Sequence, residues 1–230
     1  MSDLLNTAEH LFSGAASEAD MRAAGLHLLM VPENAGGFGG SWRDAYAVLR
    51  LAGVHAVDAS PILPDPTPDQ RAFAIIAQIA GALDAALALS VDHANTRVQF
   101  GKPLAKLQVV QQSLAVFASE AAAADAAGQA AAAALDRGDA VFEIASAKLR
   151  ANQAAVIGAA IAHQVHGAIG FTREHPLHRY TVRLSDWAAT AGNSRYWSER
   201  LGQMVCAAGP DRFWPNLTHR TDAAPERFSS

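Results

Sequence analysis

The chain has 230 residues, 50% of them hydrophobic and 17% charged, so it can form one or two domains around an ordinary hydrophobic core. Its net charge of −4 argues against a nucleic-acid-binding protein, which needs a basic face. The sequence also contains no basic amphipathic segment of the kind that binds a membrane surface. The single cysteine, Cys206, excludes an internal disulfide and fits a reducing compartment, so we expect a soluble cytoplasmic protein.

Residues 1–62 predict short helices and one turn-rich loop, a partial helical domain. The opening helix, Asp3–Phe12, lacks the basic-then-apolar order of a signal peptide. Ser17–Ala24 predicts a second helix with a serine N-cap, and the glycine-rich stretch GLHLLMVPENAGGFGG then predicts a loop. Ser41–Leu51 predicts a third helix, again with a serine N-cap.

The stretch PILPDPTPDQ contains four prolines and marks the clearest boundary, which predicts a linker at residues 63–70. Within it, Thr67-Pro68 has the pattern of an N-cap followed by proline at the first helical position. A long helix then reaches about Asn95, and Gln78 and Asp84 within it favour a core helix over a membrane span. Its apolar stripe recurs every four residues: Ile75, Ile79, Leu83, Leu87 and Val91.

The remainder of the chain also predicts helices, and no period-two strand pattern persists. The expected helices are Leu107–Leu135, Ala140–His166, Ser194–Ala207 and a helical or turn segment at Pro176–Ala189. We therefore predict an all-α fold in which residues 71–208 form a four-helix bundle, with no β-domain. Residues 209–230 contain three prolines and predict an extended tail.

General searches for catalytic chemistry find no motif. The nine histidines are scattered along the sequence, without an HExxH or Cys/His pattern, so we predict no metal site. The GFGG sequence has neither a preceding strand nor a following GK[ST], and no GxSxG elbow occurs. These observations alone would indicate only a helical bundle.

Three specific motifs remain: RVQFGKP from Arg97, QVHGAIGF from Gln164, and GLHLLMVPENAGGFGG in the first 62 residues. In this order, with long helices between them, they resemble the acyl-CoA dehydrogenase family. The resemblance covers residues 20–60, similar to part of the family's N-terminal helical domain, and residues 67–207, similar to its C-terminal four-helix domain. It implies that this chain contacts FAD held mainly by a neighbouring subunit. The residues implied are Arg97, Gln99, Phe100, Gln164, Val165 and Gly167.

Elementary chemistry agrees with these roles. The guanidinium of Arg97 is a permanently charged planar donor that suits a pyrophosphate, and Phe100 can lie against a flavin or adenine face. Gly167 permits close approach of another molecule to the backbone. Arg97 could instead be a cation at a helix C-terminus, and Gly167 and Gly170 could simply end a helix.

The chain departs from the family in its middle. The family has a β-rich domain between its helical domains, which covers the flavin ring, whereas here only PILPDPTPDQ occupies that place. The resemblance therefore implies that this chain alone holds no complete flavin site.

The chain also departs from the family at the catalytic base. Dehydrogenation removes an α-proton as a hydride leaves the β-carbon, so a carboxylate must lie over the α-carbon. The resemblance places the usual base at Ala191, or at Gly192 after a one-residue shift, and the alternative base at Gln70 or Arg71. None of the four is a carboxylate, so no catalytic residue is expected. The carboxylates nearby in sequence are Asp69 and Asp186.

The resemblance thus points to the non-catalytic subunit of a heteromeric (α2β2) acyl-CoA dehydrogenase. A full-length, acyl-CoA dehydrogenase-like partner would hold the acyl-CoA and share its FAD, and analogy suggests the CoA ester of a steroid side chain. Two alternatives remain open: a structural or regulatory pseudo-subunit that binds no nucleotide, and a self-sufficient flavoenzyme with an unrecognised base.

Overall fold

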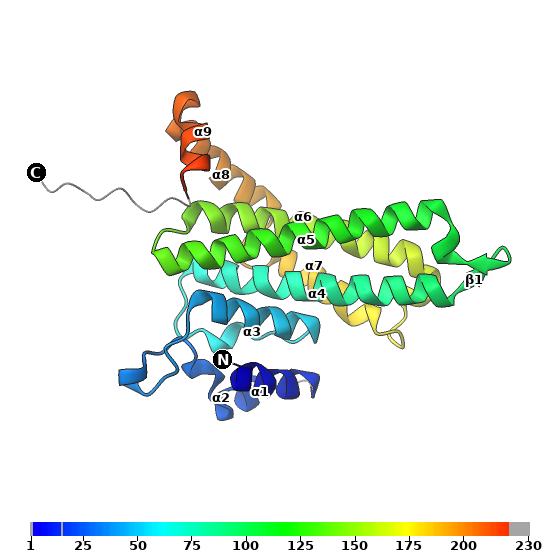
Figure 1. Cartoon of the computed structure of the whole chain (residues 1–230), viewed down its shortest axis with the longest axis horizontal. Helices are drawn as coiled ribbons and strands as arrows, with labels where there is room; N and C mark the ends of the chain where they lie inside the picture. The colour runs from blue at the N-terminus through cyan, green and yellow to red at the C-terminus, as the bar shows by residue number, and fades with distance from the viewer. Residues whose placement is uncertain (1, 15, 221–230) are drawn as a thin grey trace, which may run out of the picture.

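The computed structural model describes residues 2–14 and 16–220, and it is almost entirely helical (Figure 1). The helices are α1 (Ser2–Ser13), α2 (Glu18–Ala23), α3 (Trp42–Val54), α4 (Pro68–Thr96), α5 (Gln108–Arg137), α6 (Val141–His166), α7 (Leu177–Ala189), α8 (Ser194–Ala208) and α9 (Pro210–Thr218). Short 3₁₀ turns lie at Leu26–Leu28, Glu33–Ala35, Ser60–Ile62, Leu104–Lys106 and Gly167–Phe171. A two-stranded hairpin, β1 (Val98–Gln99) and β2 (Lys102–Pro103), joins α4 to α5. The predicted all-α fold is confirmed.

Three predicted N-caps are confirmed, at Ser17, Ser41 and Thr67. Each hydroxyl oxygen accepts the backbone N–H of the third helical residue, whose side chain accepts the N–H of the cap in return. These reciprocal partners are Asp20, Asp44 and Gln70. Such capping boxes satisfy two otherwise unpaired donors, which explains why the predicted starts of α2, α3 and α4 agree closely with the structure.

Helix α4 is the centre of the fold and packs against α3, α5, α6 and α7. Every residue from 72 to 83 is buried, so this half of α4 is enclosed on all sides. The predicted stripe is wrong at its end, because Val91 is 41% exposed. Figure 1 shows the reason: α3 lies along only the first half of α4, so the far half protrudes beyond it.

Glycines permit the close crossing of α3 and α4. A Cβ on Gly53 would overlap the backbone of Gln78, and a Cβ on Gly81 would overlap the backbone of Arg50. The two helices therefore touch through their backbones, and any larger residue would force them apart.

The C-terminal region corrects one prediction. Residues after Gly209 were expected to be extended, yet Pro210–Thr218 forms α9. Proline at the first helical position loses no hydrogen bond, because that N–H has no partner within a helix. Arg220 then pairs with Glu143 of α6, with Nη2 2.6 Å from Oε2. The rest of the predicted tail, residues 221–230, lies outside the described residues.

Two helical segments, Pro68–Thr96 and Val141–Phe171, are long and apolar enough to cross a membrane by length and composition. In the first, 72% of the most apolar window is buried inside the protein, as in the core helix of a soluble fold. In the second, 39% is buried.

Candidate functional site

The hairpin between α4 and α5 is a tight turn with an exposed tip. Gln99 pairs with Lys102, and the two residues between them, Phe100 and Gly101, have φ values of 53° and 75°. Positive φ at both central positions defines a turn of the I′ kind, which matches the twist of a hairpin. Glycine adopts this backbone freely, whereas phenylalanine does so at a cost, and the ring of Phe100 is 86% exposed.

A pocket of ≈ 520 Å³ lies at this end of the bundle, where α4 ends, α5 begins and α6 ends. Five of the six residues proposed from sequence line it: Arg97, Gln99, Gln164, Val165 and Gly167. They come from two segments more than 60 positions apart, so only the fold brings them together. Phe100 does not line the pocket, because it lies at the hairpin tip.

Positive charge dominates this pocket. Arg97 caps the C-terminus of α4 by donating its backbone N–H to the oxygen of His93 at 2.9 Å, while its side chain stays exposed. The 30-residue helix α5 begins beside it without a side-chain cap, at Leu107. No acidic side chain is among the described residues that line the pocket. A guanidinium and an uncapped helix N-terminus both favour an anion.

Gly167 marks the end of α6 with φ 65° and ψ −144°, a backbone region that is close to glycine-only. A Cβ here would meet nothing within 4 Å, so space beside the backbone is open toward the pocket. Glycine is needed at position 170 for a different reason: a Cβ added there would lie only 2.8 Å from the Cβ of His166. Val165 is buried against Ala94 and Leu104 and forms the apolar floor.

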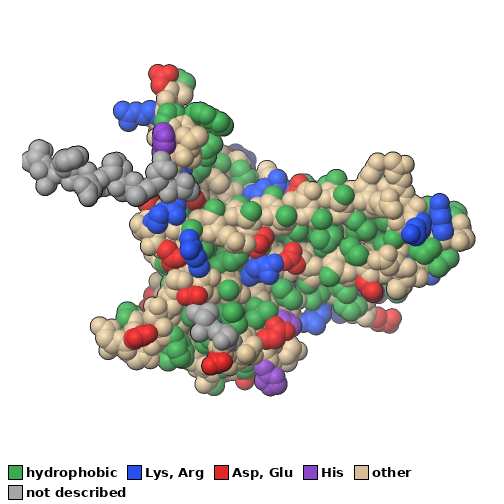
Figure 2. All heavy atoms as spheres, in the orientation of Figure 1, with side chains coloured by type: hydrophobic (Ala, Val, Ile, Leu, Met, Phe, Trp, Pro, Cys, Tyr) green, Lys and Arg blue, Asp and Glu red, His purple; other side chains and the backbone are tan. Residues whose placement is uncertain are grey.

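Large apolar side chains around the pocket are exposed. They are Val98 (57%), Phe100 (86%), Val109 (61%), Ile169 (49%) and Phe171 (66%). Figure 2 shows Lys and Arg side chains gathered at the same end of the molecule, beside hydrophobic atoms on the long helices. A group of exposed apolar side chains beside cationic ones is typical of a surface that another molecule covers.

The fold corrects the prediction that the histidines are scattered. His93 from α4, His166 from α6 and His175 before α7 place their ring nitrogens within 4.8 Å of one another. The rings of His93 and His166 stack with centroids 4.5 Å apart, and both line the pocket. Burial is the main cause that lowers the pKa of His93 and of His166, which favours the neutral form of both rings. No sequence motif marks this cluster, because the three segments meet only in the folded chain.

The turn that contains Ala191 and Gly192 is held by side-chain hydrogen bonds to its backbone oxygens. Lys148 of α6, fully buried, donates from Nζ to the oxygens of Trp187 at 3.1 Å and Gly192 at 3.2 Å, and to Oδ1 of Asn152 at 2.6 Å. Asn152 also donates to the oxygen of Gly192. Burial lowers the pKa of Lys148 to about 7, although three oxygen acceptors favour its charged form. Ala191 has φ 55°, so this anchoring holds a strained backbone.

The second position considered for a base lies at the start of α4. The side chain of Gln70 forms part of the capping box, since its Oε1 accepts the backbone N–H of Thr67 at 2.9 Å. The side chain of Arg71 donates to the backbone oxygen of Pro66. The neighbouring carboxylate, Asp69, pairs with Arg200 of α8, with Oδ2 2.9 Å from Nη2. Both carboxylate oxygens of Asp69 are bonded to this guanidinium, so neither is free to reach a substrate.

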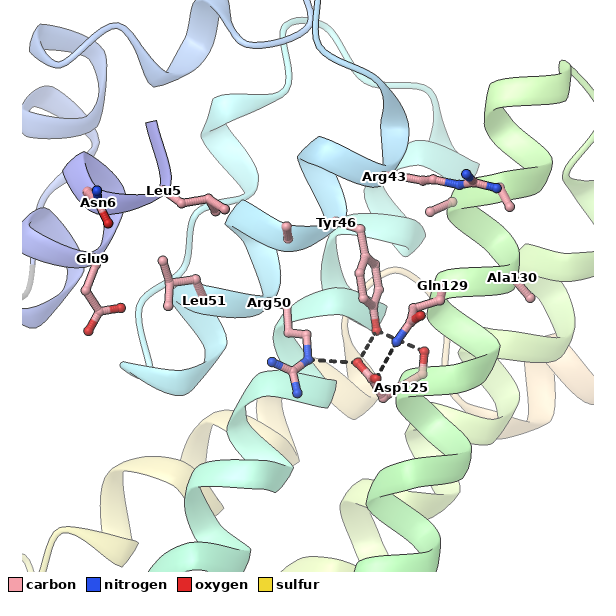
Figure 3. A pocket seen from close by; sticks show the side chains of 13 residues that line it. Leu5, Asn6, Glu9, Arg43, Tyr46, Arg50, Leu51, Asp125, Gln129 and Ala130 are labelled. Carbon is pink, nitrogen blue, oxygen red and sulfur yellow. Dashed lines mark hydrogen bonds and ion pairs between the residues drawn. The ribbon is translucent and has the colours of Figure 1, made fainter. Parts of the chain in front are cut away.

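A second cavity, of ≈ 1010 Å³, lies between α1, α3 and α5. Figure 3 shows Tyr46, Arg50 and Gln129 directed toward Asp125. Arg50 donates to Asp125 at 2.7 Å and also pairs with Asp84, while the hydroxyl of Tyr46 donates to Asp125 at 3.0 Å. Burial is the main cause that raises the pKa of Tyr46, so this hydroxyl stays protonated. The polar groups satisfy one another, which indicates a structural cross-link rather than a reactive site.

Comparison with known proteins identifies the domain. The family model for the acyl-CoA dehydrogenase C-terminal domain matches residues 69–203, more than half of the chain. Among curated proteins, acyl-CoA dehydrogenase IpdE2 of Mycobacterium tuberculosis is 36% identical over 162 residues, which cover 68% of this chain and 48% of that protein. The chain spans no more than about half the length of the curated relatives it matches.

Solved structures share the fold at low identity. A variant of the Tcur3481-Tcur3483 steroid ACAD superposes with a TM-score of 0.78 at 17% identity, covering 90% of this chain and 98% of that chain. The ChsE4-ChsE5 complex from M. tuberculosis gives a TM-score of 0.58 at 24% identity, covering 71% of this chain and 40% of that one. By the match of residues 69–203 to its C-terminal domain, the chain belongs to the acyl-CoA dehydrogenase family.

Proposed function

We propose that this chain is the FAD-completing, non-catalytic subunit of an FAD-dependent acyl-CoA dehydrogenase, in an α2β2 assembly with a full-length partner. The observation that carries the proposal is the pocket between α4, α5 and α6, because it gathers five of the six residues that the family resemblance assigns to FAD contact. The pocket opens to solvent beside an exposed apolar rim, as one half of a shared site would.

The residues fit an anionic dinucleotide. Arg97 and the uncapped start of α5 offer a fixed positive charge and free N–H donors to a pyrophosphate. Gln99 and Gln164 provide amide groups at the pocket wall, and Gly167 leaves room for close approach to the backbone. Phe100 is exposed at the tip, where it can reach an aromatic ring held by another subunit. When bound, FAD supplies the hydride acceptor for dehydrogenation.

We propose that the partner supplies the base. Ala191 and Gly192 carry no ionisable side chain, and their turn is fixed by Lys148 and Asn152. The carboxylate nearest the alternative position, Asp69, is paired with Arg200. In this account the chain contributes positioning and charge, while proton abstraction occurs on the partner's residues.

The substrate proposal is the CoA ester of a steroid side chain, held mainly by the partner. Its support is that one solved protein of this fold, which this chain covers to 98% of its length, is a steroid ACAD. A second solved relative in fold is a complex of two named components, ChsE4 and ChsE5, which favours an unlike partner here. We place the assembly in the cytoplasm, where the exposed thiol of Cys206 would stay reduced.

The test is co-expression with a full-length family member encoded beside this chain, followed by measurement of FAD affinity and acyl-CoA dehydrogenation. Arg97→Ala should weaken FAD binding by the complex roughly 10- to 100-fold, the loss expected for one charged hydrogen bond of about 1.5–3 kcal/mol. Arg195→Ala is the matched control, because Arg195 is an exposed arginine on α8 that pairs only within its own helix among the described residues. It should leave FAD affinity unchanged.

Two outcomes distinguish the alternatives. If Arg97→Ala leaves the flavin content and affinity of a well-formed complex unchanged, the chain is a structural or regulatory subunit and the FAD role is wrong. If the isolated chain carries stoichiometric FAD and turns over acyl-CoA, it is a self-sufficient enzyme and needs no partner.

A further inference from the structure

The cluster of His93, His166 and His175 plays no part in the function proposed above. The three imidazoles come from three different helix ends: the last turn of α4, the end of α6, and the residue two positions before α7. Their ring nitrogens lie within 4.8 Å of one another, and no acidic side chain belongs to the group. A set of three imidazole nitrogen donors at this spacing is chemically suited to a borderline transition-metal ion.

His166 is the best-defined member. Its side chain is 94% buried, being 6% exposed, and its Nδ1 lies 2.8 Å from the carbonyl oxygen of Ala162. That contact requires Nδ1 to carry the proton, so Nε2 carries the free lone pair. Nε2 is buried without any hydrogen-bond partner, which is costly for a polar atom. A ring N–H fixed on a backbone carbonyl is also the usual arrangement behind a metal-binding histidine.

The rings of the other two histidines lie beside that of His166. His93 stacks against His166 with centroids 4.5 Å apart, and no hydrogen bond to its ring is present among the described residues. The ring of His175 lies 4.8 Å from that of His166, at 65° to it. Its Nδ1 accepts the N–H of Leu177 at 3.2 Å, so coordination by His175 needs only the loss of one long hydrogen bond.

We propose that His93, His166 and His175 bind one divalent transition-metal ion of the zinc class, with a fourth position left for water or another ligand. The ion would connect the ends of α4 and α6 to the start of α7. Because His93 and His166 also line the pocket beside Arg97, it would add positive charge to that pocket. The proposal revises the expectation of no metal site and is independent of the proposed subunit role.

The experiment uses the tag-free, full-length chain after treatment with a chelator. Zn²⁺ should bind at a stoichiometry of one, measured against a chromophoric competitor, and Co²⁺ should give the visible absorption of a four-coordinate site. Free Zn²⁺ at 100 times its Kd should raise the Tm of the chain by roughly 5–10 °C, because the ion binds only the folded chain. Imidazole ¹⁵N spectra should show a changed Nε2 signal for His166.

His93→Ala and His166→Gln should each weaken Zn²⁺ binding at least about 10-fold, as expected when a ligand is lost. His178→Ala is the matched control, because His178 lies on α7 near the cluster but outside it. It should bind Zn²⁺ like the wild-type chain. Circular dichroism of each variant excludes unfolding as the cause.

The proposal is overturned if the wild-type chain binds no Zn²⁺, or if folded His93→Ala binds it as tightly as the His178→Ala control. Both results can be obtained on the isolated chain without flavin or partner. They therefore leave the FAD proposal untouched, just as failure of the FAD test leaves this one untouched.

Discussion

In the cavity between α1, α3 and α5, Arg50 lies between two carboxylates, Asp84 and Asp125, whereas in the pocket between α4, α5 and α6, Arg97 faces no acidic side chain among the described residues. Both arginines lie beside open space: Arg50 on α3, and Arg97 at the C-terminal cap of α4. One charge is neutralised inside the chain, and the other is left available. Cavity size is therefore a poor guide to function here: the larger cavity contains a structural cross-link, and the smaller one contains the arginine without an acidic partner among its described lining residues.

The largest expected effect is on stability at the first cavity. Arg50→Ala leaves Asp84 and Asp125 without their cation, so unfolding free energy should fall by about 2–3 kcal/mol, somewhat less than for a fully buried pair. Urea denaturation measures the change. Arg43→Ala is the control on the same helix: it is exposed and 3.9 Å from Asp136, so its loss should cost less than about 0.5 kcal/mol. Equal losses for the two variants would contradict a structural role specific to Arg50.

The second expected effect concerns pH and the buried Lys148. Burial lowers its pKa from 10.5 to about 7, so between these values the unfolded chain binds more protons than the folded one. The free energy of unfolding should therefore rise with pH from 7 toward 10, by at most about 1.4 kcal/mol per pH unit. Urea titrations at several pH values should show this rise in the wild-type chain and a smaller one in Lys148→Met.

The control for this pH effect is Lys102→Met, since Lys102 is exposed in the hairpin. Its pH dependence should follow that of the wild-type chain. If Lys148→Met keeps the wild-type slope, Lys148 is charged in the folded protein at high pH and the ammonium is stabilised by its three acceptors.

The smallest expected effect is at the hairpin tip. Phe100→Asn places the residue that tight hairpin turns prefer at a positive φ, so the isolated chain should gain a few tenths of a kcal/mol, seen as a slightly higher Tm. The same substitution removes an exposed aromatic ring, so FAD binding by the complex should weaken. A loss of stability would show that Phe100 stabilises the hairpin of this chain. An unchanged FAD affinity would show that the ring of Phe100 does not contact FAD.

Much of the fold could be predicted because its determinants are local. The caps at Ser17, Ser41 and Thr67 fix helix starts through hydrogen bonds between residues three positions apart. The burial of α4 on all sides could not be predicted, because it depends on helices far away in sequence. Helix α9 was missed because its prolines suggested an extended chain, although Pro210 occupies the one position where proline suits a helix.

The candidate site was predictable only in part. Arg97 and Gln164 belong to two motifs whose proximity the family resemblance implied, and the structure places both on one pocket. The Arg50 cross-link and the cluster around His166 left no mark in the sequence, since their members are 9 to 82 positions apart and follow no motif spacing. Such groups depend on which helix ends meet, and that is decided by tertiary packing.

We propose above that this chain holds half of a flavin site. The most direct measurement is the FAD content of the isolated chain and of its purified complex with a full-length partner, determined by absorbance after the same wash. We expect stoichiometric FAD in the complex and none retained by the isolated chain, with loss from the complex on Arg97→Ala. Stoichiometric FAD on the isolated chain, or an Arg97→Ala complex that retains FAD as the wild type does, would contradict it.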